Sequence, residues 1–100
     1  MDSLTDIAVF TQVVDSGSFT AAAERLSLSK SVVSKYVTRL EDRLGARLLN
    51  RTTRRLSLTE AGQMFYERSL RGLQEIEAAE AEVSRLQAEP RGVLRLNTPM

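Results

Sequence analysis

Several residue types on which enzymes and metal sites depend are missing from this sequence. Its 100 residues include no Cys, so neither a disulfide framework nor a thiolate metal site is possible. They also include no His, which removes the commonest general base and zinc ligand. The remaining Ser, Lys, Asp and Glu residues form no recognisable catalytic set. We therefore expect no enzyme activity, no catalytic or metal-binding residues and no cofactor.

Long apolar runs are missing as well. No stretch approaches the roughly 18 consecutive apolar residues of a membrane-spanning helix, and the start MDSLTDIAVF lacks the basic segment of a signal peptide. Because 42% of the residues are nevertheless hydrophobic, the chain can form one small domain extended by a long helix. The sequence therefore predicts a soluble, cytoplasmic protein with no membrane partner.

Charge is segregated along the chain, although the net charge is only +1. Residues 25–58 contain nine Lys and Arg against two acids, a local charge of +7, whereas residues 1–24 and 59–89 each carry −4. A basic block inside an acidic chain favours a surface that faces a polyanion such as nucleic acid. Charge alone also allows a basic surface that faces only solvent, so the decision depends on the elements that carry the charges.

Capping residues and apolar periodicity predict three helices before residue 46. The first and third are expected over residues 3–16 and 30–44, and a short second helix follows Ser18. The residues that mark the helix ends are Ser3, Ser16, Gly17, Ser18, Ser29 and Gly45. The residues expected to face the core are Leu4, Ile7, Ala8, Val13, Val14, Ala22, Ala23, Leu26, Val33, Val37, Leu40 and Leu44.

The second and third helices have the spacing of a helix-turn-helix. Only three or four residues separate them, which imposes a crossed arrangement. Ala23 is small enough for close approach, Ser27 occupies the turn, and Val33 is the buried aliphatic residue. The outer face of the third helix is short, polar and cationic, with no acid before Glu41. Such a face is suited to a DNA major groove.

A hairpin and a long helix follow. Strand-like pieces at residues 47–50 and 55–58 flank a basic tip at residues 51–54, which together with the three helices makes a mainly α, winged helix-turn-helix domain over residues 1–58. Residues 59–89 form one helix that Pro90 ends. At 1.5 Å per residue its length is roughly 45 Å, and a lone amphipathic helix is marginal in water. We interpret it as a linker helix for dimerisation; the alternative is a helix that lies back on its own domain.

Three segments resemble one known family. "SGSFTAAAERL", "VSKYVTRLEDRLGARLLNR" and "LSLTEAG" are similar to the DNA-binding region of LysR-type transcriptional regulators, and with the following helix the resemblance covers about residues 3–96. It implies a dimer that binds double-stranded DNA, with the third helix on bases, the wing tip in the minor groove and the linker helix joining two chains. It also implies that residues 90–100 begin an absent C-terminal domain that binds a small-molecule effector.

These patterns and the resemblance give three sets of candidate residues. On the recognition helix they are Ser29, Lys30, Ser31, Ser34, Lys35, Thr38 and Arg39. On the second helix and the wing they are Thr20, Arg51, Thr53, Arg54 and Arg55, with Arg54 for the minor groove. For dimerisation they are Leu70, Leu73, Ile76, Val83 and Leu86. Whether Lys30 and Lys35 contact bases or phosphates stays open, and the alternative function is a protein-interaction module that uses the winged helix as a scaffold and the long helix as a coiled coil.

Overall fold

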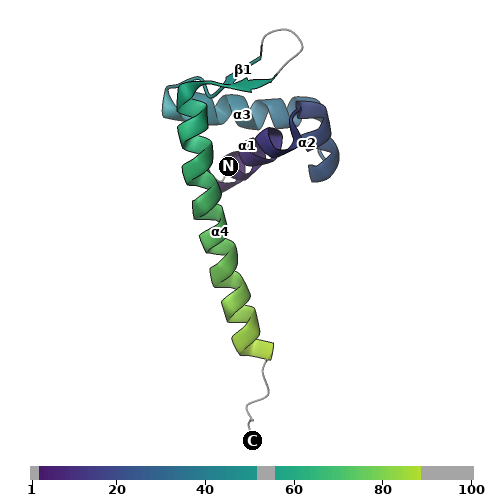
Figure 1. Cartoon of the computed structure of the whole chain (residues 1–100). Helices are drawn as coiled ribbons and strands as arrows, with labels where there is room; N and C mark the ends of the chain where they lie inside the picture. Colours follow the sequence, from purple (N-terminus) through teal and green to yellow (C-terminus); the bar gives the residue numbers. More distant parts are fainter. Residues whose placement is uncertain (1–2, 52–55, 89–100) are drawn as a thin grey trace, which may run out of the picture.

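The computed structural model describes residues 3–51 and 56–88, which contain four helices and one antiparallel two-stranded sheet. In chain order the elements are α1 (Ser3–Ser16), α2 (Phe19–Leu26), α3 (Lys30–Leu44), β1 (Leu49–Asn50), β2 (Ser57–Leu58) and α4 (Glu60–Ala88). The first three helices pack into a head, β1 and β2 (the wing) lie beside α3, and α4 leads away from the wing (Figure 1). The predicted fold class, a winged helix-turn-helix followed by a long helix, is confirmed.

The helices begin and end where local capping chemistry places them. The hydroxyls of Ser18 and Ser29 each accept a hydrogen bond from the backbone N–H three residues later, at 3.0 and 3.2 Å. Gly45 ends α3 in the left-handed backbone region with φ 68°. Ser27 adopts the same region between α2 and α3, with φ 57°, which is uncommon for a residue other than glycine. This turn fixes the crossed arrangement of the two helices.

The core lies between α1, α2 and α3 and extends to the residues that lead into the wing. Its buried side chains are Val9, Phe10, Val13, Ala22, Ala23, Val33, Val37, Leu40, Leu48 and Leu49. The inward faces predicted for α2 and α3 are confirmed except at Leu44, which is 40% exposed. Leu44 lies in the last turn of α3, where the chain leaves the core at Gly45.

The predicted inward face of α1 was partly wrong, since Leu4 and Ala8 are exposed. The buried stripe follows helical spacing through Asp6, Val9, Phe10 and Val13. A charged residue therefore occupies the first position of this stripe. The carboxylate of Asp6, only 3% exposed, lies 3.8 Å from the guanidinium of Arg43 on α3. Because an acid is rarely buried without a partner, sequence periodicity alone places it outside.

The wing is shorter than predicted. Leu49 pairs with Leu58 and Asn50 with Ser57, and residues 52–55 lie outside the described residues. Just before β1, a side chain takes the place of a strand partner. The backbone carbonyl of residue 47 accepts a hydrogen bond from the hydroxyl of Thr59 at 2.6 Å. The predicted strand over residues 47–50 is thus reduced to its last two residues.

Thr59 and Gly62 join the wing to α4. The Thr59 hydroxyl accepts a hydrogen bond from the backbone N–H of Gly62 at 2.9 Å, which caps the helix. Gly62 is buried, and a Cβ at that position would overlap the backbone carbonyl of Leu48. Glycine is therefore required for α4 to approach the wing this closely.

Past this junction, α4 packs along α1 and then extends beyond the head (Figure 1). The rings of Phe10 and Phe65 have centroids 5.9 Å apart, and the Tyr66 hydroxyl donates a hydrogen bond to the carboxylate of Asp15. That bond, together with burial and the charge of Asp15, raises the pKa of Tyr66 above its ordinary 10.0. Residues 74–88 are all exposed. Within the described part of the chain, no helix combines the length and apolar character needed to cross a membrane.

Substituting Gly62 tests the junction. Gly62→Ala should lower the free energy of unfolding by about 1–3 kcal/mol, because the added methyl group must displace the backbone at Leu48. Gly72→Ala is the matched control, since nothing lies within 4 Å of a Cβ there; it should raise the unfolding free energy by about 0.5–1 kcal/mol. Both are measured by denaturant unfolding at one low protein concentration. Equal effects would contradict the close approach of α4 to Leu48.

Candidate nucleic-acid interface

The outer face of α3 carries most of the predicted recognition residues. Lys30, Ser31, Lys35, Thr38 and Arg39 are exposed, Ser34 is half-buried, and Ser29 is exposed at the helix cap. The opposite side of the same helix is fixed in the core. Packing thus presents one hydroxyl-rich, cationic face on a rigid support, and it brings the α3 candidates together as predicted.

An apolar residue interrupts this polar face. Val32 is 37% exposed and lines an open hollow of about 220 Å³ with Lys35, Tyr36 and Arg39. Sequence periodicity did not single out Val32, because its neighbour Val33 satisfies the core stripe. All of the residues that line the hollow belong to α3.

Arg51, predicted to face DNA, is directed toward the head. Its guanidinium lies 3.1 Å from the carboxylate of Glu41, 3.4 Å from the hydroxyl of Thr38 and 5.3 Å from the ring centroid of Phe19. The Arg51 side chain is 28% exposed. In this position Arg51 connects the end of β1 to α3 and α2. Thr38 shares that contact while remaining exposed on α3.

Glu41 is the residue that sequence reasoning missed. It is 8% exposed, and its Oε2 accepts hydrogen bonds from the backbone N–H groups of Leu48 and Leu49 at 2.9 and 3.2 Å, while Oε1 binds Arg51. The sequence suggested only an acid at the end of a basic run. The available signal was its position four residues after Val37, on the buried stripe of α3, where a carboxylate needs partners.

Of the remaining candidates on α2 and the wing, only Thr20 lies among the described residues. Thr20 is exposed in the first turn of α2. Thr53, Arg54 and Arg55 lie outside the described residues. Across residues 3–51 and 56–88, no cluster of three or more acids is arranged to hold a metal ion.

The predicted dimerisation residues divide into two groups along α4. Leu70 and Leu73 are half-buried beside the head. The exposed members are Ile76 at 40%, Val83 at 58% and Leu86 at 53%. The first group is therefore partly covered by its own domain, while the second faces solvent.

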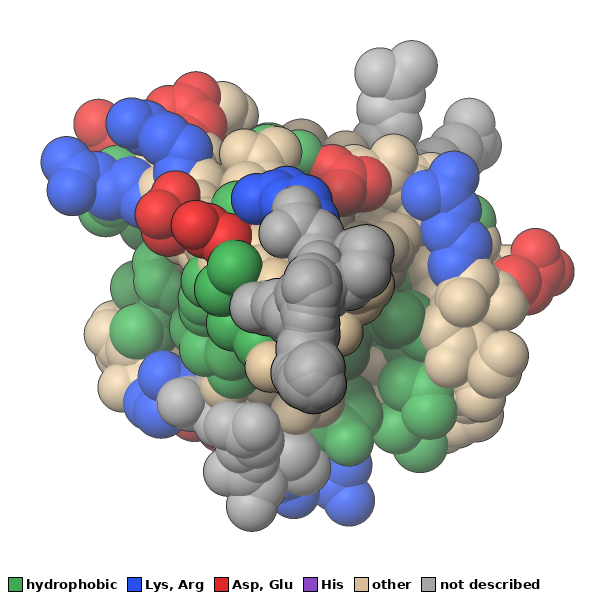
Figure 2. Space-filling view, turned by 90° about the horizontal axis from the view of Figure 1, so that it is seen from below, with side chains coloured by type: hydrophobic (Ala, Val, Ile, Leu, Met, Phe, Trp, Pro, Cys, Tyr) green, Lys and Arg blue, Asp and Glu red, His purple; other side chains and the backbone are tan. Residues whose placement is uncertain are grey.

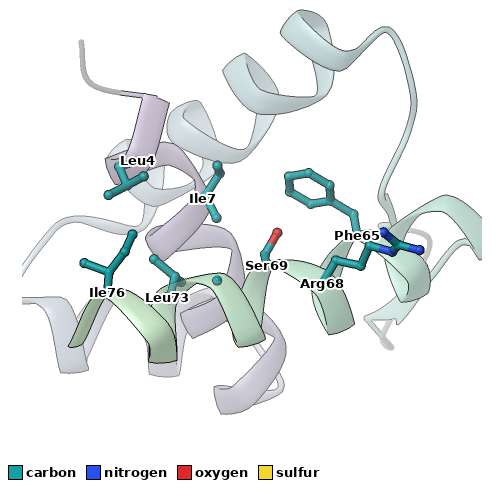
Figure 3. A pocket seen from close by; sticks show the side chains of 8 residues that line it. Leu4, Ile7, Phe65, Arg68, Ser69, Leu73 and Ile76 are labelled. Atoms are coloured by element: carbon teal, nitrogen blue, oxygen red, sulfur yellow. The ribbon is translucent and has the colours of Figure 1, made fainter. Parts of the chain in front are cut away.

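An apolar hollow of about 230 Å³ lies where α4 passes α1. Leu4 and Ile7 of α1 face Leu73 and Ile76 of α4 across it (Figure 3). Seen from the C-terminal end of α4, apolar side chains gather on the underside of the head beside this helix (Figure 2). Ile76 belongs both to this hollow and to the exposed apolar residues of α4.

Comparisons with known proteins agree with one another. The family described as "Bacterial regulatory helix-turn-helix protein, lysR family" matches residues 4–63. The HTH-type transcriptional regulator CrgA of Neisseria meningitidis is 53% identical over 95 residues, which are 95% of this chain and 32% of CrgA. This chain spans about a third of the length of the curated relatives that it matches.

Two solved structures extend the comparison. CrgA from N. meningitidis, described as a LysR-type transcriptional regulator, gives a TM-score of 0.71 at 53% identity over 83% of this chain and 28% of that one. A complex of the BenM DNA-binding domain with catB site 1 DNA gives a TM-score of 0.83 at 29% identity, over 90% of this chain and 99% of the BenM chain.

Neutralising Glu41 tests its role at this interface. Glu41→Gln should lower the free energy of unfolding by about 3 kcal/mol, because it leaves the Arg51 guanidinium without its carboxylate. The control Glu24→Gln, exposed on α2, should change it by less than about 0.5 kcal/mol. Adding Arg51→Met to Glu41→Gln should recover part of the loss in denaturant unfolding. Strictly additive losses would show that the two residues are not coupled.

Proposed function

Because the chain belongs to the lysR family of bacterial regulatory helix-turn-helix proteins, we propose that it binds double-stranded DNA sequence-specifically as a homodimer and thereby regulates transcription. The observation that carries the proposal is the outer face of α3, where the exposed cations Lys30, Lys35 and Arg39 stand among short hydroxyl side chains. Relatives named as transcriptional regulators and the BenM complex with DNA support it. The role is regulatory rather than catalytic, and it would be exercised in the bacterial cytoplasm.

We infer that α3 enters the major groove, which has room for an α-helix. Ser31 and Ser34 are short enough to let the helix backbone approach the base edges. Lys30, Lys35 and Arg39 extend from it toward phosphates or bases on either side. The lysines act as point charges without the planar fork of arginine, so phosphate contact suits them best.

The wing complements α3 in this proposal. Arg54, flanked by Thr53 and Arg55, would enter the adjacent minor groove, whose narrow form attracts cations; this assignment is based on the sequence and the family. Arg51 contributes from inside, by fixing the end of β1 against Glu41. Thr20 at the start of α2 would donate a hydrogen bond to a phosphate.

The division of the chain is part of the same proposal. Residues 1–58 bind DNA, residues 59–89 link two chains, and residues 90–100 begin a C-terminal domain that binds a small-molecule effector. The exposed apolar stripe of α4 supports the dimer, because an isolated helix with such a stripe gains little stability in water. A two-fold dimer presents two copies of α3 to two half-sites.

The salt dependence of binding tests the DNA contact. If each head contacts about four phosphates, a dimer contacts about eight, and the logarithm of the binding constant against that of the salt concentration should slope near −7, at about −0.9 per phosphate. The measurement is a titration of a selected duplex at several salt concentrations. A slope shallower than about −2 would favour the protein-interaction alternative.

Charge variants locate the contact. Lys35→Gln should make the slope shallower by about 2 in a dimer, one phosphate per head. Arg85→Gln is the matched control, since it also removes one positive charge. Arg85 lies at the far end of α4, which leads away from α3 (Figure 1), so this variant should leave the slope unchanged. Similar changes in both variants would mean that general charge, and not the α3 face, determines binding.

Charges on α4 test the dimer. Ile76→Glu with Val83→Glu places two carboxylates in the exposed stripe without entering the core, so sedimentation should report a monomer, and binding to a palindromic duplex should weaken far more than binding to a half-site. Gln74→Glu with Ala81→Glu has the same seven-residue spacing on the opposite side of α4 and should stay dimeric. A double variant at 76 and 83 that stays dimeric would place the interface elsewhere.

A further inference from the structure

Val32 is an exposed aliphatic residue on the face of α3 that is otherwise polar. Its side chain is 37% exposed and does not belong to the core cluster. Valine in a helix has one strongly preferred χ1 rotamer, so its two methyl groups point in a fixed direction. A single exposed valine is ordinary on a protein surface, and its neighbours are what give this one significance.

Val32 belongs to one longitudinal stripe of α3. Residues 32, 35, 36 and 39 follow the i, i+3, i+4, i+7 spacing and together line the open hollow of about 220 Å³. Tyr36 forms its second apolar wall and is itself held, because it packs against the core cluster. Lys35 and Arg39 contribute aliphatic stems while their charged ends extend toward solvent. The hollow therefore has fixed apolar walls and a cationic rim.

The apolar walls and the cationic rim together indicate which chemical group would fit the hollow. The cationic rim is complementary to a phosphate backbone, while the walls favour an apolar group. On the base edges of the major groove the apolar group is the C5-methyl of thymine, since the other edges present hydrogen-bond donors and acceptors. We propose that Val32, backed by Tyr36, contacts the C5-methyl group of one thymine in each half-site and so specifies that base. This inference rests on the proposed function, in which α3 lies in the major groove.

Removing one methyl group from the DNA tests the contact. A duplex that the wild-type chain selects from a random-sequence pool supplies the site, and each thymine of a half-site is replaced singly by deoxyuridine, which lacks only that methyl. Wild type should bind about fourfold more weakly at one thymine position, the amount expected for one buried methyl group. Val32→Ala should bind the thymine and deoxyuridine duplexes equally at that position.

Leu28→Ala is the matched control. Leu28 is another exposed aliphatic residue, 38% exposed, just before α3 and outside the hollow. This variant should retain the fourfold discrimination at the same thymine. Because Val32 is not in the core cluster, Val32→Ala should fold normally, which thermal unfolding verifies.

The possible failures are distinguishable. If wild type binds its selected duplex but no thymine is sensitive to deoxyuridine, or if Val32→Ala keeps the full loss, Val32 does not contact the methyl group, while DNA binding itself stands. If wild type prefers no duplex over competitor DNA, both the contact and the proposed function are overturned.

Discussion

The carboxylate of Glu41 holds the wing against α3, and the geometry of the proposed interface depends on it. Burying a carboxylate is costly unless its oxygens are bonded. Here two backbone N–H groups and the guanidinium of Arg51 supply the bonds. Because Glu41 belongs to α3 while these donors lie in residues 48–51, its carboxylate joins the helix directly to the start of the wing. In the proposed function, this contact would set how α3 and the described part of the wing approach DNA together.

A second constraint sets the direction of α4. Thr59 caps the helix, and Gly62 lets its first turn lie on the backbone of Leu48. The helix has 29 residues, so at 1.5 Å per residue it is about 44 Å long, and a change of about 10° at the junction would move its far end by about 8 Å. In a dimer joined through α4, that angle would determine the distance between two copies of α3. In such a dimer, small local contacts at residues 59–62 would control a large-scale spacing.

Features with local causes were predictable from the sequence, and features with tertiary causes were not. The caps Ser18 and Ser29 and the terminator Gly45 act on their own helices, so the boundaries of α2 and α3 follow from a few neighbouring residues. The inward turn of Arg51 and the burial of Glu41 arise only when α3 and β1 meet. The burial of Asp6 could not be predicted for the same reason. Its partner Arg43 lies beside it only after α1 and α3 have packed together.

The same contacts explain how a chain of net charge +1 can face a polyanion. Of the nine cations in residues 25–58, Arg43 and Arg51 lie beside the buried acids Asp6 and Glu41. On the outer face of α3 the exposed cations Lys30, Lys35 and Arg39 outnumber the exposed acid Asp42, because Glu41, the other acid of this helix, points inward. The acids at positions 75–82 lie more than about 20 Å along α4 from its start, in the half that leads away from α3 (Figure 1). Since the Debye length at physiological salt is about 8 Å, their charge is screened at α3. The field that a duplex would meet at α3 is set by the nearby charges, among which cations outnumber Asp42, and the net charge of the whole chain does not describe it.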